Sequence, residues 1–231
     1  MNKNSLFLTL LFIFSSYVSK AQLNEDQLGK WYMYFFNTTV KESSWGVQGD
    51  IQYRNWNIIG DLEQLLLRGG LTYKPKNTSV KFTLGYGHVT SGTYGEDKST
   101  STESRIYQEI LYPTKIGGRV YLNHRFRYEQ RFVENQDFRT RYRFNLFINV
   151  PLNSKEMIAK TVYLACYNEL FINGERAIGK SRTVEVFDRN RLYVALGYIF
   201  NENLKTQFGV MNQTTDNWSK NQLQFSLHHQ F

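Results

Sequence analysis

Strict alternation of apolar and arginine-bearing positions between residues 120 and 150 is the feature that most constrains how this chain can fold. The pattern predicts two strands, Val120–Phe132 and Phe138–Val150, joined by the polar turn at residues 133–137. Because successive side chains of a strand point to opposite faces, each strand has one apolar face and one arginine-bearing face, with Phe147 the exception on the latter. The segment therefore predicts a sheet with water on one side and an apolar environment on the other.

Alternating segments of this kind recur along the whole chain, separated by clusters of Gly, Asn, Asp, Ser and Lys. No segment beyond the N-terminus has the length and apolarity of a membrane helix, so a membrane form of this chain would have to be a closed barrel. The pattern gives eleven candidate strands: 29–40, 45–56, 62–73, 80–89, 103–112, 120–132, 138–150, 161–171, 187–200, 204–211 and 222–231.

We expect a single transmembrane antiparallel β-barrel, with the inward face of segment 161–171 left unassigned by its sequence. Single-chain bacterial barrels have an even number of strands, so eleven candidates are awkward. We expect twelve strands, one of them missed, and ten is the alternative if segment 29–40 is not part of the wall. With the C-terminus in the periplasm, the polar runs at 90–102 and 172–185 fall outside the cell as long loops.

Residues 1–21 have the features of a secretory signal peptide. Lys3 gives a positive start, residues 6–14 form a short apolar run, and Ser19-Lys20-Ala21 ends in a small-x-small pattern. The mature chain is expected to begin at Gln22 and to form one barrel domain over residues 22–231. Its single cysteine excludes a disulfide framework.

The net charge of +8 does not indicate a nucleic-acid partner, because the arginines repeat along strands and the chain is exported. A soluble lipocalin-like barrel is the alternative to a membrane barrel, but it would place the arginines outside. Aromatic residues near strand ends favour the membrane barrel, since outer-membrane barrels carry aromatic girdles at both interfaces. These residues are Trp31, Trp45, Tyr73, Tyr112, Tyr198 and Phe200.

Arginines dominate the predicted inner face, where Asp50, Glu103 and Glu109 oppose them. The guanidinium fork suits carboxylate, phosphate or sulfate, so one interpretation is a lumen that passes or binds small anionic solutes. The other is a salt-bridged plug that seals a narrow barrel. The predicted lumen residues are Arg54, Arg68, Arg105, Arg125, Arg127, Glu129, Arg131, Arg139, Arg141, Arg143, Arg189 and Arg191.

The two strands of residues 120–150 form a hairpin, which we call the central hairpin. Pairing Phe132 with Phe138 sets its register. Like charges directly opposite each other are unfavourable in a sheet, so this register requires counter-charges from elsewhere. The predicted pairs are Arg131 with Arg139, Glu129 with Arg141, and Arg127 with Arg143.

A lipid-acting hydrolase or acyltransferase of the outer membrane is a third, weaker interpretation, because it requires a Ser–His pair with an orienting group. His88 near Ser91 is the nearest candidate, whereas His124 and His229 fall on the apolar face. No metal-ligand spacing, phosphate loop or nucleophile elbow is present. We therefore assign no catalytic residue, metal or cofactor.

Several short motifs are distributed over nearly the whole mature chain: Gly29-Lys30-Trp31, Gln52-Tyr53-Arg54, Asp61-Leu62-Glu63-Gln64, Leu84-Gly85-Tyr86-Gly87, Arg105-Ile106-Tyr107-Gln108, His124 to Phe132, Arg139 to Arg143, Asn168-Glu169-Leu170-Phe171 and Asn190-Arg191-Leu192. Together they resemble one bacterial family, domain-of-unknown-function family 2490. The resemblance implies an export signal, an outer-membrane β-barrel of Gram-negative bacteria in contact with outer-membrane lipid, and a terminal aromatic, Phe231, that the barrel-insertion machinery recognises. It implies no activity.

Overall fold

The computed structural model describes residues 27–95 and 97–231, so the predicted signal peptide lies outside the described residues. Within these ranges no helix is long and apolar enough to cross a membrane. The strands, in chain order, are β1 (Gly29–Thr39), β2 (Trp45–Asn55), β3 (Leu62–Tyr73), β4 (Lys81–Gly92), β5 (Thr100–Ile116), β6 (Val120–Val133), β7 (Arg139–Pro151), β8 (Val162–Asn173), β9 (Phe187–Asn201), β10 (Leu204–Thr214) and β11 (Ser219–Gln230).

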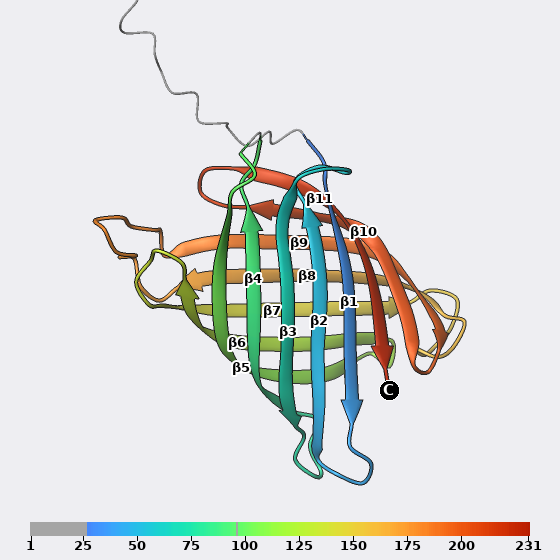
Figure 1. Cartoon of the computed structure of the whole chain (residues 1–231). Helices are drawn as coiled ribbons and strands as arrows, with labels where there is room; N and C mark the ends of the chain where they lie inside the picture. Colours follow the sequence, from blue (N-terminus) through green and yellow to red (C-terminus); the bar gives the residue numbers. More distant parts are fainter. Residues whose placement is uncertain (1–26, 96) are drawn as a thin grey trace, which may run out of the picture.

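These strands form one closed barrel in which each strand pairs with its sequence neighbours in antiparallel fashion. The parallel pair of β1 and β11 closes the barrel. In Figure 1, β1–β4 run steeply across β6–β9 of the far wall, as strands that tilt from a barrel axis do. The start of β1 and the C-terminus lie at opposite ends of the barrel (Figure 1). We call these the loop end, where residues 174–186 lie, and the C-terminal end, where Phe231 lies.

The strand count corrects the expectation of twelve, and the alternative of ten is also wrong. All eleven alternating segments are wall strands, including the segment that starts at Gly29. An odd number of strands closes because β1 and β11 run parallel, and the even-number expectation assumed that they would be antiparallel.

Strand bounds agree closely with the alternation except in β5, which extends from Thr100 to Ile116 instead of covering only 103–112. Its polar ends still pair with β4 and β6, because backbone hydrogen bonds and not apolar side chains make a β-ladder. The predicted loop at 90–102 is therefore reduced to residues 93–99.

The central hairpin of β6 and β7 has the predicted register, and the Phe132 and Phe138 rings lie 5.3 Å apart beside its turn. Like charges thus oppose each other in two of the three predicted pairs, so other strands must supply counter-charge. The confirmed pairs are Arg131 with Arg139, Glu129 with Arg141, and Arg127 with Arg143.

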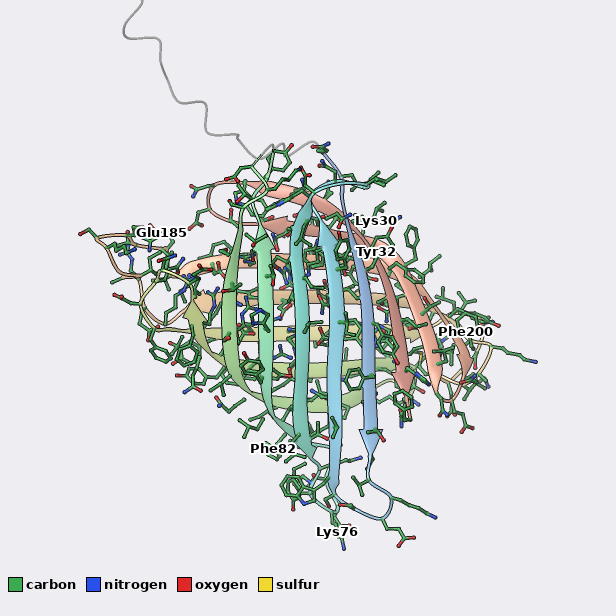
Figure 2. All side chains as sticks on the ribbon, in the orientation of Figure 1. Lys30, Tyr32, Lys76, Phe82, Glu185 and Phe200 are labelled. Atoms are coloured by element: carbon green, nitrogen blue, oxygen red, sulfur yellow. The ribbon has the colours of Figure 1, made fainter. Side chains whose placement is uncertain are left out.

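Large apolar side chains cover the outside of the barrel, and polar side chains line most of its interior beside a buried apolar cluster that includes Trp31, Tyr163 and Tyr193. Phe82 and Phe200 are 42% and 49% exposed and point away from the wall (Figure 2). At alternate positions the side chains are buried, and many of them are charged. The inner wall includes glycines where a ring needs room, since a Cβ at Gly85 would lie 2.2 Å from the Tyr107 ring. The fold therefore sorts polarity between the two faces of its wall.

Candidate site in the barrel interior

The structure places all eleven predicted arginines on the inner side of the wall, where none is exposed. Three of them, Arg68, Arg125 and Arg189, are partly buried. The other eight are buried: Arg54, Arg105, Arg127, Arg131, Arg139, Arg141, Arg143 and Arg191.

Carboxylates on β5, β6 and β8 neutralise most arginines of the central hairpin. Arg141 and Arg143 each donate to the Glu129 carboxylate, with nitrogen–oxygen distances of 2.6 Å. Arg143 also donates to Oε1 of Glu169 at 2.6 Å, and so does Arg125. Charge-assisted hydrogen bonds of this length are among the strong ones in proteins. We call the following residues the paired network: Arg125, Arg127, Arg141 and Arg143 with Glu109, Glu129 and Glu169.

Toward the loop end, Glu103 binds two arginines in the same way. Arg105 and Arg131 donate to its Oε2 at 2.8 and 3.0 Å. Asp188 accepts from Arg141 at 2.8 Å and from Arg189 at 3.1 Å, which joins Arg189 to the paired network. Of the four arginines in the like-charged pairs, acids bind Arg127, Arg131 and Arg143, whereas Arg139 forms no ion pair with a described residue.

A different arrangement surrounds Trp31 on β1. The guanidinium carbons of Arg54 and Arg191 lie 3.8 and 4.9 Å from the centre of its indole ring, and the indole nitrogen donates to Glu63 at 2.7 Å. We call Trp31, Arg54 and Arg191 the tryptophan cluster. Cation–π contact of this kind stabilises a guanidinium without neutralising its charge.

The two arginines of the tryptophan cluster are hydrogen-bonded to amides. Arg54 donates to the side-chain oxygens of Gln52 and Gln64, and Arg191 donates from Nε to Gln213 at 2.7 Å. Within residues 27–95 and 97–231, neither arginine has a carboxylate oxygen within 4.0 Å. Their positive charge is therefore not neutralised by a direct ion pair with a described residue.

Two chambers can be distinguished in the interior formed by the described residues. The C-terminal chamber has a volume of about 310 Å³ and reaches Lys205 and His228 near the C-terminal end. The loop-end chamber has a volume of about 180 Å³ and is lined mainly by arginine side chains. Four arginines line both chambers and so lie between them: Arg54, Arg68, Arg143 and Arg191.

The sequence patterns missed several charged residues of this interior. Glu169 escaped notice because β8 carries apolar side chains on both faces, which hides the alternation. Its position opposite Asn145 of β7 is the signal that could have identified it. Other missed residues are Glu63, Lys81, Asp188, Lys205 and Lys220, of which Glu63 lies next to a register shift between β2 and β3.

The residues predicted as candidates for catalysis, His88 and Ser91, do not form a Ser–His pair. His88 and Ser91 lie three residues apart on β4 and therefore on opposite faces of the wall, because side chains alternate. Ser226 does contact His228, with 3.0 Å between Oγ and Nε2, but no carboxylate of the described residues hydrogen-bonds the other ring nitrogen. Among the same residues, no cluster of three or more His, Cys, Asp or Glu side chains could hold a metal ion.

Comparison with known proteins gives a family and no activity. Residues 28–224 match a family model described as "Protein of unknown function (DUF2490)". No curated protein matches the chain, and no solved structure does.

Proposed function

Because the chain belongs to the DUF2490 family, whose description gives no function, we propose its role from the geometry: an integral outer-membrane β-barrel that binds small anionic solutes in its lumen. The observation that carries the proposal is the distribution of charge across the wall. Arginines gather inside, while large apolar side chains cover the outside. A closed wall of this kind separates a lipid environment from enclosed water.

The membrane location is supported by the exposed apolar surface of the barrel. Phe126, Phe144, Leu196 and Phe208 lie on four different strands and are each more than 40% exposed. Monomeric soluble proteins rarely expose a contiguous apolar area of this extent, whereas hydrocarbon would cover it without cost. The predicted export signal agrees with this location.

Anion binding is supported by an excess of cations in the interior. Eleven guanidiniums face seven carboxylates, which leaves four positive charges in excess before any lysine is counted. An uncompensated charge in a closed interior is costly, so a bound anion would lower the free energy of the folded barrel. The seven carboxylates belong to Asp50, Glu63, Glu103, Glu109, Glu129, Glu169 and Asp188.

Equilibrium dialysis of the barrel in lipid nanodiscs tests the proposal, with empty nanodiscs as the blank. Benzoate and phosphate are the anionic probes, and benzylammonium is the cation matched in size to benzoate. We expect the barrel to retain at least one anion and to exclude the cation. Equal retention of benzoate and benzylammonium, or no retention of either anion, would contradict anion binding.

A sealed structural barrel is the second candidate, and the paired network favours it. Ion pairs such as those of Glu129 with Arg141 and Arg143 fill space and join β6 to β7, as a plug would. Planar-bilayer recordings, with Arg127→Ala and Arg143→Ala as variants, separate sealing from passage. A steady anion-selective current through the unmodified barrel would exclude the sealed barrel.

A further inference from the structure

The C-terminal chamber differs from the loop-end chamber in having an apolar wall beside its cations. Alternation along β1 turns Trp31, Met33 and Phe35 to the same inner face, and all three line this chamber. Phe147 and Tyr193 add further ring surface from β7 and β9. An apolar stripe thus extends from the tryptophan cluster toward the C-terminal end.

The deep end of this stripe holds two arginines that form no direct ion pair with a described carboxylate, and the one acid bound to the same indole, Glu63, balances at most one of them. Arg54 and Arg191 flank the Trp31 ring and also line the chamber. In contrast, the chamber's own carboxylates are already engaged by other arginines: Asp50 by Arg68, Glu109 by Arg127, and Glu169 by Arg125 and Arg143.

Unsatisfied hydrogen-bonding groups gather beside the same cations. Within the described ranges, Gln224 Nε2 and Tyr193 Oη have no hydrogen-bond partner, although these residues are only 1% and 2% exposed. Gln224 lies opposite Trp31 in the β1–β11 pair, and Tyr193 lies two residues after Arg191 on β9. Buried polar groups in native proteins are nearly always paired, so these two groups, which both line the chamber, are available to an acceptor bound in it.

We propose that the C-terminal chamber binds a small amphipathic carboxylate, with its anionic head at Arg54 and Arg191 and its apolar body along Met33 and Phe35. The guanidinium fork matches a carboxylate, and the Gln224 and Tyr193 donors would complete its hydrogen bonds. A volume of about 310 Å³ lies at the small end of the range for ligand pockets, which suits a single ring or a short chain. This inference rests on the proposed function and names the class of solute.

Isothermal titration of the barrel in nanodiscs, with three probes, tests both parts of the ligand. 3-Phenylpropionate has the charge and the apolar body, 3-phenylpropionamide has the body alone, and inorganic phosphate has charge alone. We expect 3-phenylpropionate to bind at least about tenfold more tightly than either comparison probe, because only it satisfies the cations and covers the apolar stripe. Empty nanodiscs correct for partition into lipid.

Variants at Arg191 test where the carboxylate head of the ligand binds. Arg191→Gln should weaken 3-phenylpropionate binding by about tenfold or more, because it removes a charge-assisted hydrogen bond. Arg191→Lys, which keeps the charge, should recover part of the affinity. The matched control is Arg176→Gln, since Arg176 lies in the β8–β9 loop and pairs with Glu185 at the surface. The control should bind as the unmodified barrel does.

The outcomes separate this inference from the proposal on which it rests. If phosphate or the amide binds as tightly as 3-phenylpropionate, the amphipathic carboxylate is wrong. Loss of affinity in the Arg176→Gln control equal to that in Arg191→Gln would remove the tryptophan cluster from the site. If neither phosphate nor 3-phenylpropionate binds the unmodified barrel, anion binding in the lumen fails as well.

Discussion

Two groups of buried arginines in one barrel have opposite surroundings. In the paired network, each arginine donates to a carboxylate of its own or another strand, as Arg143 does to Glu129 and Glu169. In the tryptophan cluster, Arg54 and Arg191 contact an indole ring and amide oxygens instead. The first arrangement cancels charge and stabilises the wall, whereas the second leaves charge available to a ligand.

The comparison shows why counting arginines cannot reveal the role of a lumen. A buried guanidinium whose carboxylate is nearby is part of the structure, and removing that carboxylate is costly. A guanidinium whose partners are neutral retains its field, so that an anion from solution can complete its surroundings. The neighbours of each arginine therefore decide between plug and binding site, and both occur in this barrel.

The largest effect should come from breaking the paired network at Glu129. Glu129→Gln removes the negative charge that Arg141 and Arg143 share and leaves them only Asp188 and Glu169 as carboxylate partners, so the free energy of unfolding should fall by about 3–5 kcal/mol. Urea unfolding in lipid vesicles measures the change. Glu185→Gln is the control, because the exposed Glu185–Arg176 pair should contribute about 1 kcal/mol or less. Equal effects of the two variants would mean that the network does not stabilise the wall.

A substitution on the outer face tests whether both groups of arginines are enclosed by a lipid-facing wall. Phe144, opposite Phe126 on β6, is 49% exposed at the middle of β7. Phe144→Arg should lower the free energy of unfolding in vesicles by about 2–4 kcal/mol, because an arginine near the bilayer midplane is desolvated. Ile59→Arg, in the exposed β2–β3 loop, should have little effect. An unchanged stability for Phe144→Arg would indicate that water covers this face.

Converting the tryptophan cluster to a paired arrangement sharpens the comparison further. Gln213→Glu places a carboxylate where an amide now accepts from Arg191, so binding of 3-phenylpropionate should weaken by about tenfold. Gln213→Met, which adds no charge, should keep the affinity within about twofold. Isothermal titration in nanodiscs measures the affinity of each variant for 3-phenylpropionate. Equal losses of affinity in both variants would show that packing and not charge determines binding.

The smallest effect is expected for the stability of Arg191→Gln. Since Arg191 has no carboxylate partner among the described residues, the substitution leaves no orphaned acid, and the free energy of unfolding should change by about 1 kcal/mol or less. Urea unfolding without added anion provides the measurement. A loss as large as that of Glu129→Gln would place Arg191 among the structural arginines.

The sequence alone predicts the wall well, because alternation is a local property. All eleven segments are strands, and the register of the central hairpin follows from pairing Phe132 with Phe138. The count was wrong because closure depends on how β1 meets β11, two strands far apart in the chain. Parallel closure has no local signature.

The site could be predicted only in part. The arginines are visible from their spacing and the Glu129–Arg141 pair from the hairpin register, but other partners depend on contacts between strands that the alternation does not relate. Arg125 and Glu169, for example, come from strands that are not neighbours in the sheet. The position of Arg54 and Arg191 beside Trp31 likewise joins β1, β2 and β9. Such contacts follow from closure and could not be inferred from alternation.

Cell fractionation shows whether this wall separates lipid on its outer face from arginine-lined water within. The chain should be recovered in the outer-membrane fraction and resist extraction with alkaline carbonate, because its exposed apolar surface is stable only in hydrocarbon. Recovery of the folded chain in the soluble periplasmic fraction would contradict the account.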